Sequence, residues 1–569
     1  MNIADQLKPQ YDSPLEWWYI HGNFTLPGGE EYYFVFSFFR NQFQNDDSKG
    51  EQGYQAIFSI IGADKLKTRR FTYIDQAFFN GILSYQAKVP TINIDLNMRI
   101  VSLLLSGAKK TSIPYVIKES SPIIDCCPIS IKWEEISYCF DGRQIDFSMY
   151  DKNEGIDLKL TLELTKPLID IFDREPEHMD RYRMAYLTQS RLPVSGNFNN
   201  TQIVAGQSWI DHQWGTHDYL FNQKNNKEVR GWNWLGINLE DKSDLLIWQH
   251  LNAETLETID SQAFWIINDN VVRADDITIV SIKDWFSHET ESYFPVGLRI
   301  IIPEFSADLI FTPLTDKQEI PVFGPMRSVW QGAGKISGSI KGRSITGTAR
   351  LELSGHSYLF NVRDHFAKVS KRIESVLKDY FTSIPDKDNH SKHQRERAWG
   401  SIVAYYMLKA LETDPQPFEQ LIFVLAELMH TGKDPYFIHS QLIQNHPNLS
   451  GFQKHEILSL FKNYPANNDP GKSFKGLAEL SAIISNSDAE TRHACGLFGQ
   501  KLGIAYQLIK DTIYFKESGQ PGNESLETYR EAAISMVDES WTAVSRHLPL
   551  SESTVLIRVL ADHVLDETL

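Results

Sequence analysis

The sequence is poor in cysteine, in long apolar runs and in positive charge, and each shortage excludes a class of protein. Four cysteines in 569 residues make no disulfide framework. Cys126 and Cys127 are adjacent and no CxxC pair exists, so a zinc site is not expected. No stretch of about 18 apolar residues is present, which argues against a membrane-spanning helix. The net charge of −17 argues against a nucleic-acid partner, whose binding needs a basic face.

The opening segment "MNIADQLKPQ" also lacks the basic and apolar regions of a signal peptide. We therefore expect a cytoplasmic location. A chain of this length exceeds a single hydrophobic core, so several domains are expected.

The hydrophobic pattern changes near residue 360. Before it, "EYYFVFSFFR" (31–40) is an aromatic β-rich run, and "IDLKLTLEL" (156–164) alternates apolar with polar residues after a turn signal. Because no long helical pattern interrupts this part, it is predicted to be all-β.

Beyond residue 360 the apolar residues recur with a helical period. Phe366, Val369, Ile373, Leu377 and Tyr380 mark one helix face. Further apolar helical runs occupy 399–412, 417–430, 474–485, 496–514 and 525–547. The chain is predicted to divide at about 355–370 into an all-β part and an all-α part.

Two segments place a carboxylate among aromatic rings. "EWWYIHGNF" (16–24) opens with Glu16, and "SWIDHQWG" (208–215) sets Asp211 between Trp209 and Trp214. A carboxyl group buried in an apolar pocket keeps its proton near neutral pH, and aromatic π-faces stabilise a carbocation. Protonation of an unactivated alkene requires both a protonated acid and a surface that stabilises the cation. The alternatives are a buried hydrogen-bond or arginine partner for Glu16, and a turn or barrel-closing hydrogen bond for Asp211.

Three blocks in order resemble the carotenoid hydratase (hydroxyneurosporene synthase) family and its AttH-like relatives. They are "SPLEWWYIHGNF" (13–24), "GQSWIDHQWGTH" with the "GWNWLGINLEDKSDLLIW" that follows it, and "VWQGAGKISGSIKGRSITGTARLELSGHSY" (329–358). The resemblance spans 11–360. It implies two lipocalin-like β-barrel halves, 1–200 and 201–360, with an aromatic cleft where they meet.

The same resemblance points to Asp211 as the proton donor. Trp209 stands where the hydratases have a tyrosine, which removes a hydroxyl that could hold water and favours cyclisation over hydration. Glu16 is the second candidate acid, and His212 is a candidate to orient the acid or to take a proton back. The expected substrate-binding residues are Trp17, Trp18, Tyr19, Trp209, Trp214, Trp232, Trp234, Tyr186 and Arg191.

Other chemistries have little support in the sequence. His212 and His217 are five residues apart on a strand or turn and do not converge on a metal. No GxSxG elbow is present, so hydrolase chemistry has no specific signal. We expect no metal and no cofactor.

The helical part resembles the isoprenyl diphosphate synthase fold over 365–569, through "FVLAELMHTGKDPYFIH" (423–439) and "FGQKLGIAYQLIKDTIYF" (498–515). That family binds magnesium and diphosphate with clustered aspartates. Here Lys433 precedes Asp434 and Lys510 precedes Asp511, so each site keeps a lone carboxylate beside a lysine. The resemblance implies a degenerate synthase domain that serves as a scaffold or pairs two chains in a homodimer.

Together these features predict an enzyme that protonates a hydrophobic isoprenoid and then cyclises or hydrates it. Uptake of such a substrate would bring the protein into peripheral contact with a membrane. The alternatives are a pericyclase of the same fold, a class I prenyl or terpene synthase in the helical part, and a carrier that binds an isoprenoid without converting it.

Overall fold

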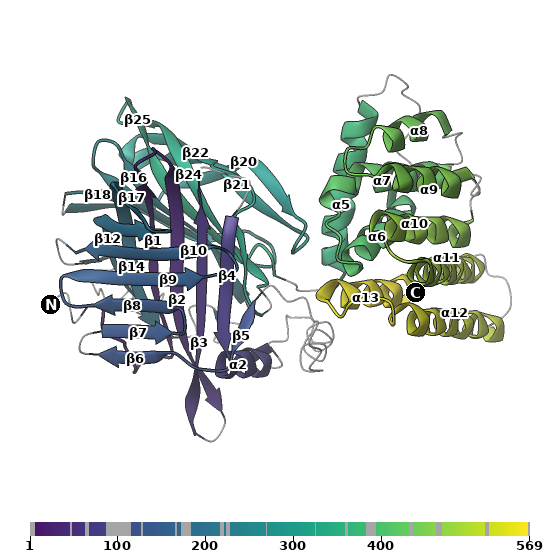
Figure 1. The fold of residues 1–569 in the computed structure, drawn as a ribbon, viewed down its shortest axis with the longest axis horizontal. Coiled ribbons are helices and arrows are strands. Elements are labelled where there is room, and N and C mark those ends of the chain that lie inside the picture. The colour runs from purple at the N-terminus through teal and green to yellow at the C-terminus, as the bar shows by residue number, and fades with distance from the viewer. Residues whose placement is uncertain are drawn as a thin grey trace. The chain divides into compact units, whose positions relative to one another are not determined.

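The computed structural model describes residues 6–45, 48–62, 68–86, 115–126, 129–164, 168–171, 184–216, 221–222, 228–268, 270–324, 326–358, 362–382, 394–431, 436–462, 469–517 and 523–566. The chain divides into two compact units near residue 360. Strands dominate the first unit and helices make up the second (Figure 1). This confirms the predicted order of an all-β part followed by an all-α part.

The described strands of the first unit form two sheets. The first sheet has the order β5-β4-β3-β2-β1-β14-β12-β10-β9-β8-β7-β6, with β11 and β13 beside β12. Its central pairs are antiparallel, and β5 runs parallel to β4. Its strands are β1 (Leu15–Thr25), β2 (Glu31–Asn45), β3 (Ser48–Ile61), β4 (Thr68–Asp75), β5 (Val116–Lys118), β6 (Ile123–Cys126), β7 (Ile129–Trp133), β8 (Ile136–Phe140), β9 (Gln144–Asp151), β10 (Ile156–Glu163), β11 (Ile169–Asp170), β12 (Met184–Phe198), β13 (Thr201–Gln202) and β14 (Ala205–Gly215).

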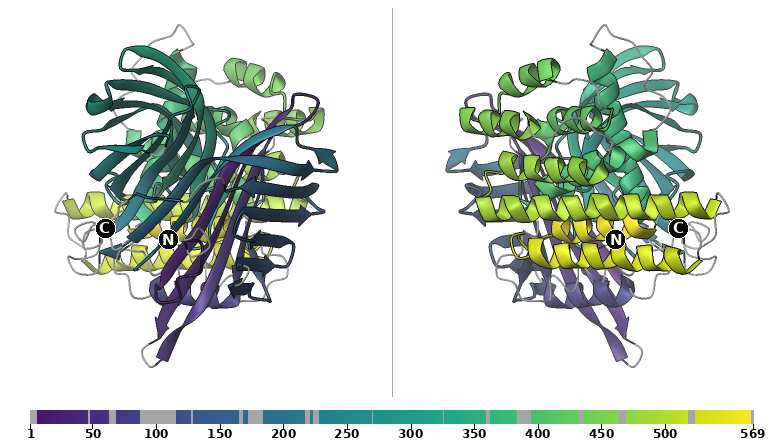
Figure 2. Two further views of the ribbon diagram at one scale, coloured as in Figure 1. Left: turned by 90° about the vertical axis from the view of Figure 1, so that its left-hand side faces the viewer. Right: turned by 90° about the vertical axis from the view of Figure 1, so that its right-hand side faces the viewer.

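The second sheet has the order β19-β18-β17-β16-β25-β24-β22-β21-β20, with β15 beside β16 and β23 beside β24. Its strands are β15 (Phe221–Asn222), β16 (Glu228–Leu239), β17 (Asp244–Asn252), β18 (Thr258–Ile267), β19 (Asn270–Ala274), β20 (Thr278–Ser287), β21 (Ser292–Ile302), β22 (Ala307–Pro313), β23 (Glu319–Pro321), β24 (Ser328–Ile340) and β25 (Arg343–Ser354). A 3-10 turn, η2 (Pro303–Phe305), joins β21 to β22. Figure 2 shows the two sheets as curled layers, purple to blue and teal to green.

Period-2 sequence patterns produce these sheets. In β10, Ile156, Leu158, Leu160 and Leu162 are buried, whereas the residues between them are partly or fully exposed. Full burial of each such side chain is worth about 1.5–3 kcal/mol. Each sheet curls around its own apolar core, and a third apolar cluster joins side chains of both sheets.

Two features of the β unit differ from the sequence predictions. Strand β14 pairs with β1 and β12, so the first sheet extends to Gly215 and the expected boundary at 200/201 lies too early. A helix, α2 (Gln76–Gln86), also interrupts the strands. It begins after Asp75, whose Oδ1 accepts a hydrogen bond of 2.8 Å from the backbone N–H of Phe78 and so caps the helix.

The second unit is helical throughout its described residues. Its elements are α5 (Val362–Thr382), α6 (Gln394–Ala410), η3 (Gln416–Phe418), α7 (Glu419–Thr431), α8 (Tyr436–Gln444), α9 (Gly451–Lys462), α10 (Pro470–Ile484), α11 (Ala489–Glu517), α12 (Asn523–Val544) and α13 (Glu552–Asp566). In Figure 1 the helices from α8 to α12 lie one above another, and α5 crosses them at one end. Phe366, Val369 and Ile373 of the predicted α5 face are buried. No described helix is long and apolar enough to cross a membrane.

Candidate active site

An apolar cavity with a volume of about 190 Å³ lies between the two sheets. Strands of both sheets and helix α2 contribute to its wall. The aromatic residues that line it include Trp17, Tyr19, Tyr186, Trp232, Trp234 and Trp248. Such a wall excludes bulk water and presents many π-faces, which suits an apolar unsaturated ligand.

Strand β1 supplies side chains to the cavity from one face only. Trp17 and Tyr19 line the cavity, whereas Trp18 and Ile20 point into the core of the first sheet. Successive residues of "EWWYIHGNF" therefore face opposite sides of the sheet, and of its two tryptophans only Trp17 lines the cavity.

Asp211 of β14 lines the same cavity and is only 2% exposed. Its Oδ1 accepts hydrogen bonds from the Thr188 hydroxyl (2.5 Å) and from Trp209 Nε1 (3.0 Å), and the Tyr186 hydroxyl lies 3.0 Å from Oδ2. Burial raises the pKa of Asp211 from 3.8 to about 7, even though these three hydrogen bonds lower it. Part of the population therefore holds a proton at neutral pH.

The two oxygens of Asp211 have different hydrogen-bond partners. An indole N–H can only donate, so Oδ1 must remain an acceptor toward Trp209. Oδ2 meets the Tyr186 hydroxyl, which also accepts a hydrogen bond of 2.8 Å from Trp234 Nε1. The Tyr186 hydroxyl donates to Oδ2 when Asp211 is ionised, and it can rotate and accept when Oδ2 is protonated. Tyr186 and Trp234 line the cavity, so this oxygen lies on the cavity side.

The cavity contains a second carboxyl group, Glu352 of β25, which the sequence analysis missed. Trp232 Nε1 donates to its Oε1 (2.6 Å), and Gln331 Nε2 donates to its Oε2. The Tyr19 hydroxyl donates to Gln331 Oε1 (2.9 Å), which links the two sheets. Burial raises the pKa of Glu352, while the hydrogen bonds from Trp232 and Gln331 and the charge of Arg350 lower it.

The only sequence signal for Glu352 is the alternation in "ARLELSG". Leu351 and Leu353 belong to the core of the second sheet, so Glu352 must point to the opposite face. Taken alone, such a pattern predicts a glutamate exposed to solvent. The first sheet covers that face, and only the packing of the two sheets makes Glu352 a cavity residue.

His250 of β17 is a third titratable residue of the cavity wall that the sequence analysis missed. Its Nδ1 lies 2.7 Å from Asp260 Oδ1 on the neighbouring strand β18. A carboxylate at this position fixes the orientation of the imidazole ring.

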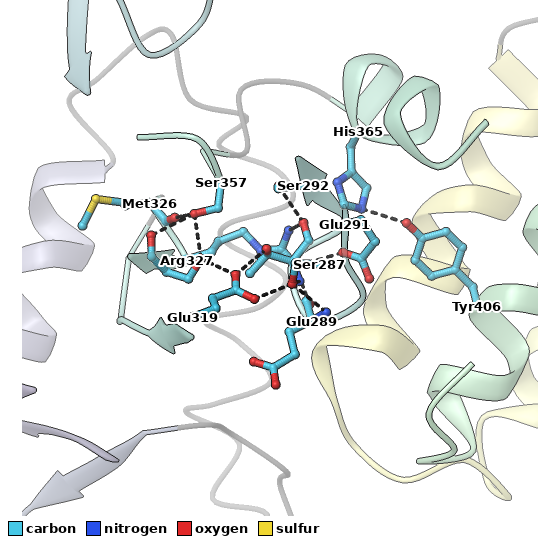
Figure 3. Close-up of polar contacts among 12 residues, drawn as sticks. Ser287, Glu289, Glu291, Ser292, Glu319, Met326, Arg327, Ser357, His365 and Tyr406 are labelled. Atoms are coloured by element: carbon cyan, nitrogen blue, oxygen red, sulfur yellow. Dashed lines mark hydrogen bonds and ion pairs between the residues drawn. The ribbon is translucent and has the colours of Figure 1, made fainter. Parts of the chain in front are cut away.

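The connection between β23 and β24 forms part of the cavity wall through Val322, Phe323 and Met326. A buried polar cluster holds it in place (Figure 3). The carboxyl group of Glu319 accepts hydrogen bonds from the hydroxyls of Ser287, Ser328 and Thr290, the last at 2.7 Å. Arg327 forms an ion pair of 3.2 Å with Glu291. Burial raises the pKa of Glu319, and the hydrogen bonds from these hydroxyls compensate for the cost of burying its carboxyl group.

Glu16 and His212 are expected catalytic residues that do not line the cavity. Both lie on the opposite faces of β1 and β14, because alternation turns them away from Trp17 and Asp211. Glu16 forms an ion pair of 2.7 Å with Arg40 and lies 2.9 Å from His212 Nε2, and all three side chains are fully buried. Glu16 therefore has the buried arginine partner that the sequence analysis gave as the alternative to an acid role.

Three expected substrate-binding residues also lie away from the cavity. Trp18 donates to the Leu7 carbonyl oxygen (3.1 Å), and Trp214 packs against the core of the first sheet. Arg191, at a bulge of β12, forms an ion pair of 2.9 Å with Asp244. Trp209 does not line the cavity, but its indole N–H holds Asp211. The remaining five expected residues, Trp17, Tyr19, Tyr186, Trp232 and Trp234, line it.

The structure describes only some of the residues that the sequence analysis considered at possible metal sites. His217, Lys433 and Asp434 lie outside the described residues. Asp511 of α11 accepts a hydrogen bond of 2.7 Å from Gln507 one turn earlier. Within the described part of the chain, no group of three or more His, Cys, Asp or Glu side chains is arranged to hold a metal.

Comparisons with known proteins give a family match within the β unit. Residues 127–356 match the model of the AttH-like family. No curated protein sequence matches the chain significantly. The family match covers Asp211 and Glu352 but not strand β1.

Three solved structures are similar to parts of the chain. An AttH protein of Nitrosomonas europaea is 19% identical with a TM-score of 0.45, over 62% of this chain and 95% of its own. Kievitone hydratase of Nectria haematococca is 11% identical with a TM-score of 0.42, over 62% and 92%. A decaprenyl diphosphate synthase of Rhodobacter capsulatus is 14% identical with a TM-score of 0.27, over 36% and 99%.

Proposed function

We propose that the β unit is an enzyme that protonates an apolar, unsaturated isoprenoid with Asp211 and then cyclises or hydrates it. One observation carries this proposal: a carboxyl group with a pKa of about 7 lies in an aromatic cavity between two sheets. Asp211 is the acid in this scheme, and it needs no metal ion to deliver its proton.

The aromatic wall supports the second step, in which a carbocation forms. Trp17, Trp232 and Trp234 line the same cavity as Asp211. A cation over such a ring gains about 0.5–2 kcal/mol when water is excluded, and the ring is too weak a nucleophile to trap it. The cavity therefore suits a positive charge that moves along an apolar chain.

The final step depends on whether water or a carbon–carbon double bond reaches the cation. Trp209 at the hydratase tyrosine position favours cyclisation, because its indole N–H is committed to Asp211 and Thr188. The substrate is proposed to be a polyprenyl compound, in line with the resemblance of the helical part to isoprenyl diphosphate synthases. A carotenoid hydratase activity is the hydrating form of the same proposal.

The variant Asp211→Asn tests the proposal. The amide keeps the shape of the protonated carboxyl group but cannot give up a proton. We expect turnover of a polyprenyl panel to fall at least a hundredfold, the lower end of general acid catalysis at about 10²–10⁴. Wild-type turnover should fall as the pH rises through about 7, because Asp211 then loses its proton.

Mass spectrometry of products made in the presence of EDTA distinguishes the outcomes. An unchanged mass indicates cyclisation, and the gain of one water indicates hydration. A modest loss of rate in Asp211→Asn would favour a pericyclase, which needs shape but no acid. Unchanged ligand binding with no product from the wild type would favour a carrier and contradict the proposal.

A further inference from the structure

Two carboxyl groups on different sheets line this cavity. Asp211 lies on β14 of the first sheet and Glu352 on β25 of the second. Tyr19 is the register partner of Asp211, and Gln331 is the register partner of Glu352. The hydrogen bond from Tyr19 to Gln331 joins the two neighbourhoods across the cavity.

We propose that Glu352 is a second catalytic residue, the base that accepts the proton released when the carbocation is quenched. This inference rests on the proposed function, in which Asp211 starts the reaction. Glu352 would then act on the same substrate in the last step, when the cation loses a proton.

The reaction needs an acceptor for the proton that the cation releases, and Glu352 lines the same cavity as the acid. In the first step the O–H bond of Asp211 breaks and a C–H bond forms, which leaves a cation on the substrate. In cyclisation a second double bond of the substrate attacks the cation, which forms a C–C bond and a new cation. A C–H bond next to the new cation then breaks, its electrons form a double bond, and the proton passes to Glu352. In hydration water adds to the cation and its O–H proton passes to Glu352. Solvent then takes the proton from Glu352 and returns one to Asp211.

Burial raises the pKa of Glu352, and its hydrogen bonds oppose this rise by favouring the ionised form, which a base requires. Each of its oxygens accepts one hydrogen bond, from Trp232 Nε1 and from Gln331 Nε2. The amide of Gln331 is oriented by the Tyr19 hydroxyl, which donates to its oxygen. Neither Trp232 Nε1 nor Gln331 Nε2 can accept a proton from Glu352, so both stabilise a carboxylate.

The two carboxyl groups also divide the acid and base roles. The negative charge of Glu352 raises the pKa of Asp211. Ionised Glu352 therefore helps Asp211 to keep its proton, as in other pairs of nearby carboxyl groups. This effect of Glu352 on the pKa of Asp211 is smaller than that of burial and of the three hydrogen bonds.

Of the other titratable groups near the pair, His250 is the one that competes with Glu352 as the base. Burial raises the pKa of Tyr19 well above 10, so it stays neutral. Arg350 on β25 donates to the carbonyl oxygens of Gln331 and Phe34. Tyr186 is engaged with Asp211 and Trp234. His250 lines the cavity with Asp260 as its partner, and it is the group to compare with Glu352.

The test compares Glu352→Gln with the full-length wild type on a polyprenyl substrate in D2O. We expect turnover to fall at least a hundredfold. Asp211 still protonates the double bond, and without an acceptor the proton returns to it. Unreacted substrate recovered from Glu352→Gln should therefore contain deuterium, whereas substrate recovered from Asp211→Asn should contain none.

Two further variants separate catalysis from structure. Glu352→Asp should restore part of the turnover, because it keeps a carboxylate in the cavity. Asp244→Asn removes a buried carboxyl group of the same sheet that does not line the cavity, and it should not change the pH profile. In Glu352→Gln the fall of residual turnover near pH 7 should shift to lower pH, because the charge that raises the pKa of Asp211 is gone.

The results distinguish this inference from the proposed function. If Glu352→Gln keeps wild-type turnover and pH profile while Asp211→Asn is inactive, the role of Glu352 is wrong and the proposed function stands. Full activity of His250→Ala together with loss in Glu352→Gln supports Glu352. The opposite pattern assigns the base to His250 and overturns the inference. An active Asp211→Asn overturns the proposed function itself.

Discussion

Asp211 holds its proton near neutral pH because burial outweighs three hydrogen bonds that favour its ionised form. Ionising such a buried group at high pH lowers the free energy of unfolding. Its folded pKa is above its unfolded pKa, so the folded state binds more protons between about pH 4 and 7. Stability is therefore highest below this range and falls as the pH rises through it.

Asp211→Asn should remove this pH-dependent cost, since an amide has no charge to bury. The stability of the variant relative to the wild type should rise between pH 4 and pH 8 by up to about 4 kcal/mol, at 1.36 kcal/mol for each pKa unit. Denaturant unfolding at several pH values measures the difference. A difference that does not change with pH would show that Asp211 is ionised in the folded protein near pH 4, against the basis of the proposed function.

Alternation along strand β1 places core side chains on one face and cavity side chains on the other. Glu16 and Trp18 face the core of the first sheet, and Trp17 and Tyr19 face the cavity. Gly22 lies where β1 and β14 approach closely, because a Cβ there would come within 2.5 Å of the Gln207 carbonyl oxygen. Any side chain at this position would push the two strands apart and disturb the register that places Tyr19 beside Asp211.

The pair of variants Trp17→Leu and Trp18→Leu tests this division of β1. Trp18 is fully buried, so its replacement should cost about 2–3 kcal/mol of stability and leave the product pattern unchanged. Trp17→Leu should melt near the wild-type temperature but change the product distribution or reduce turnover. Thermal melting and product analysis of both variants provide the measurement. If both variants lose only stability, Trp17 does not contact the reacting chain.

At the scale of the whole molecule, the proposed chemistry belongs to the β unit. The helical unit folds around its own core, in which α6 and α7 bury most of their apolar residues. Its retained carboxylates, Asp434 and Asp511, are single residues beside lysines in the sequence. Homodimer formation through this unit, peripheral membrane contact and a cytoplasmic location stay predictions.

The double variant Asp434→Ala with Asp511→Ala, made in the full chain, should keep most of the wild-type turnover with and without EDTA. The reason is that lone carboxylates bind Mg²⁺ poorly. Steady-state assays on a polyprenyl substrate measure this, with circular dichroism as the control for folding. A loss of tenfold or more in a folded variant, about 1.4 kcal/mol in the barrier, would favour the class I alternative.

Local patterns in the sequence were enough to predict the two fold classes and the aromatic surroundings of Asp211. Periodicity and neighbouring residues carry this information, because they decide which face of a strand or helix is apolar. Helix α2 was missed, since one short helix among strands leaves a weak periodic signal. The boundary after β14 was also missed, because strand pairing between distant segments leaves no local trace.

Only the tertiary structure decided which buried polar residues meet. Glu16 and Asp211 look alike in sequence, each a carboxylate among tryptophans, yet Arg40 neutralises one and burial in the cavity protonates the other. Glu352 entered the site because the second sheet packs its outer face against the first. A sequence determines the faces of its strands by local alternation. Long-range packing decides what each face contacts. Those contacts shift the pKa of a buried carboxyl group and so decide whether it can act as an acid.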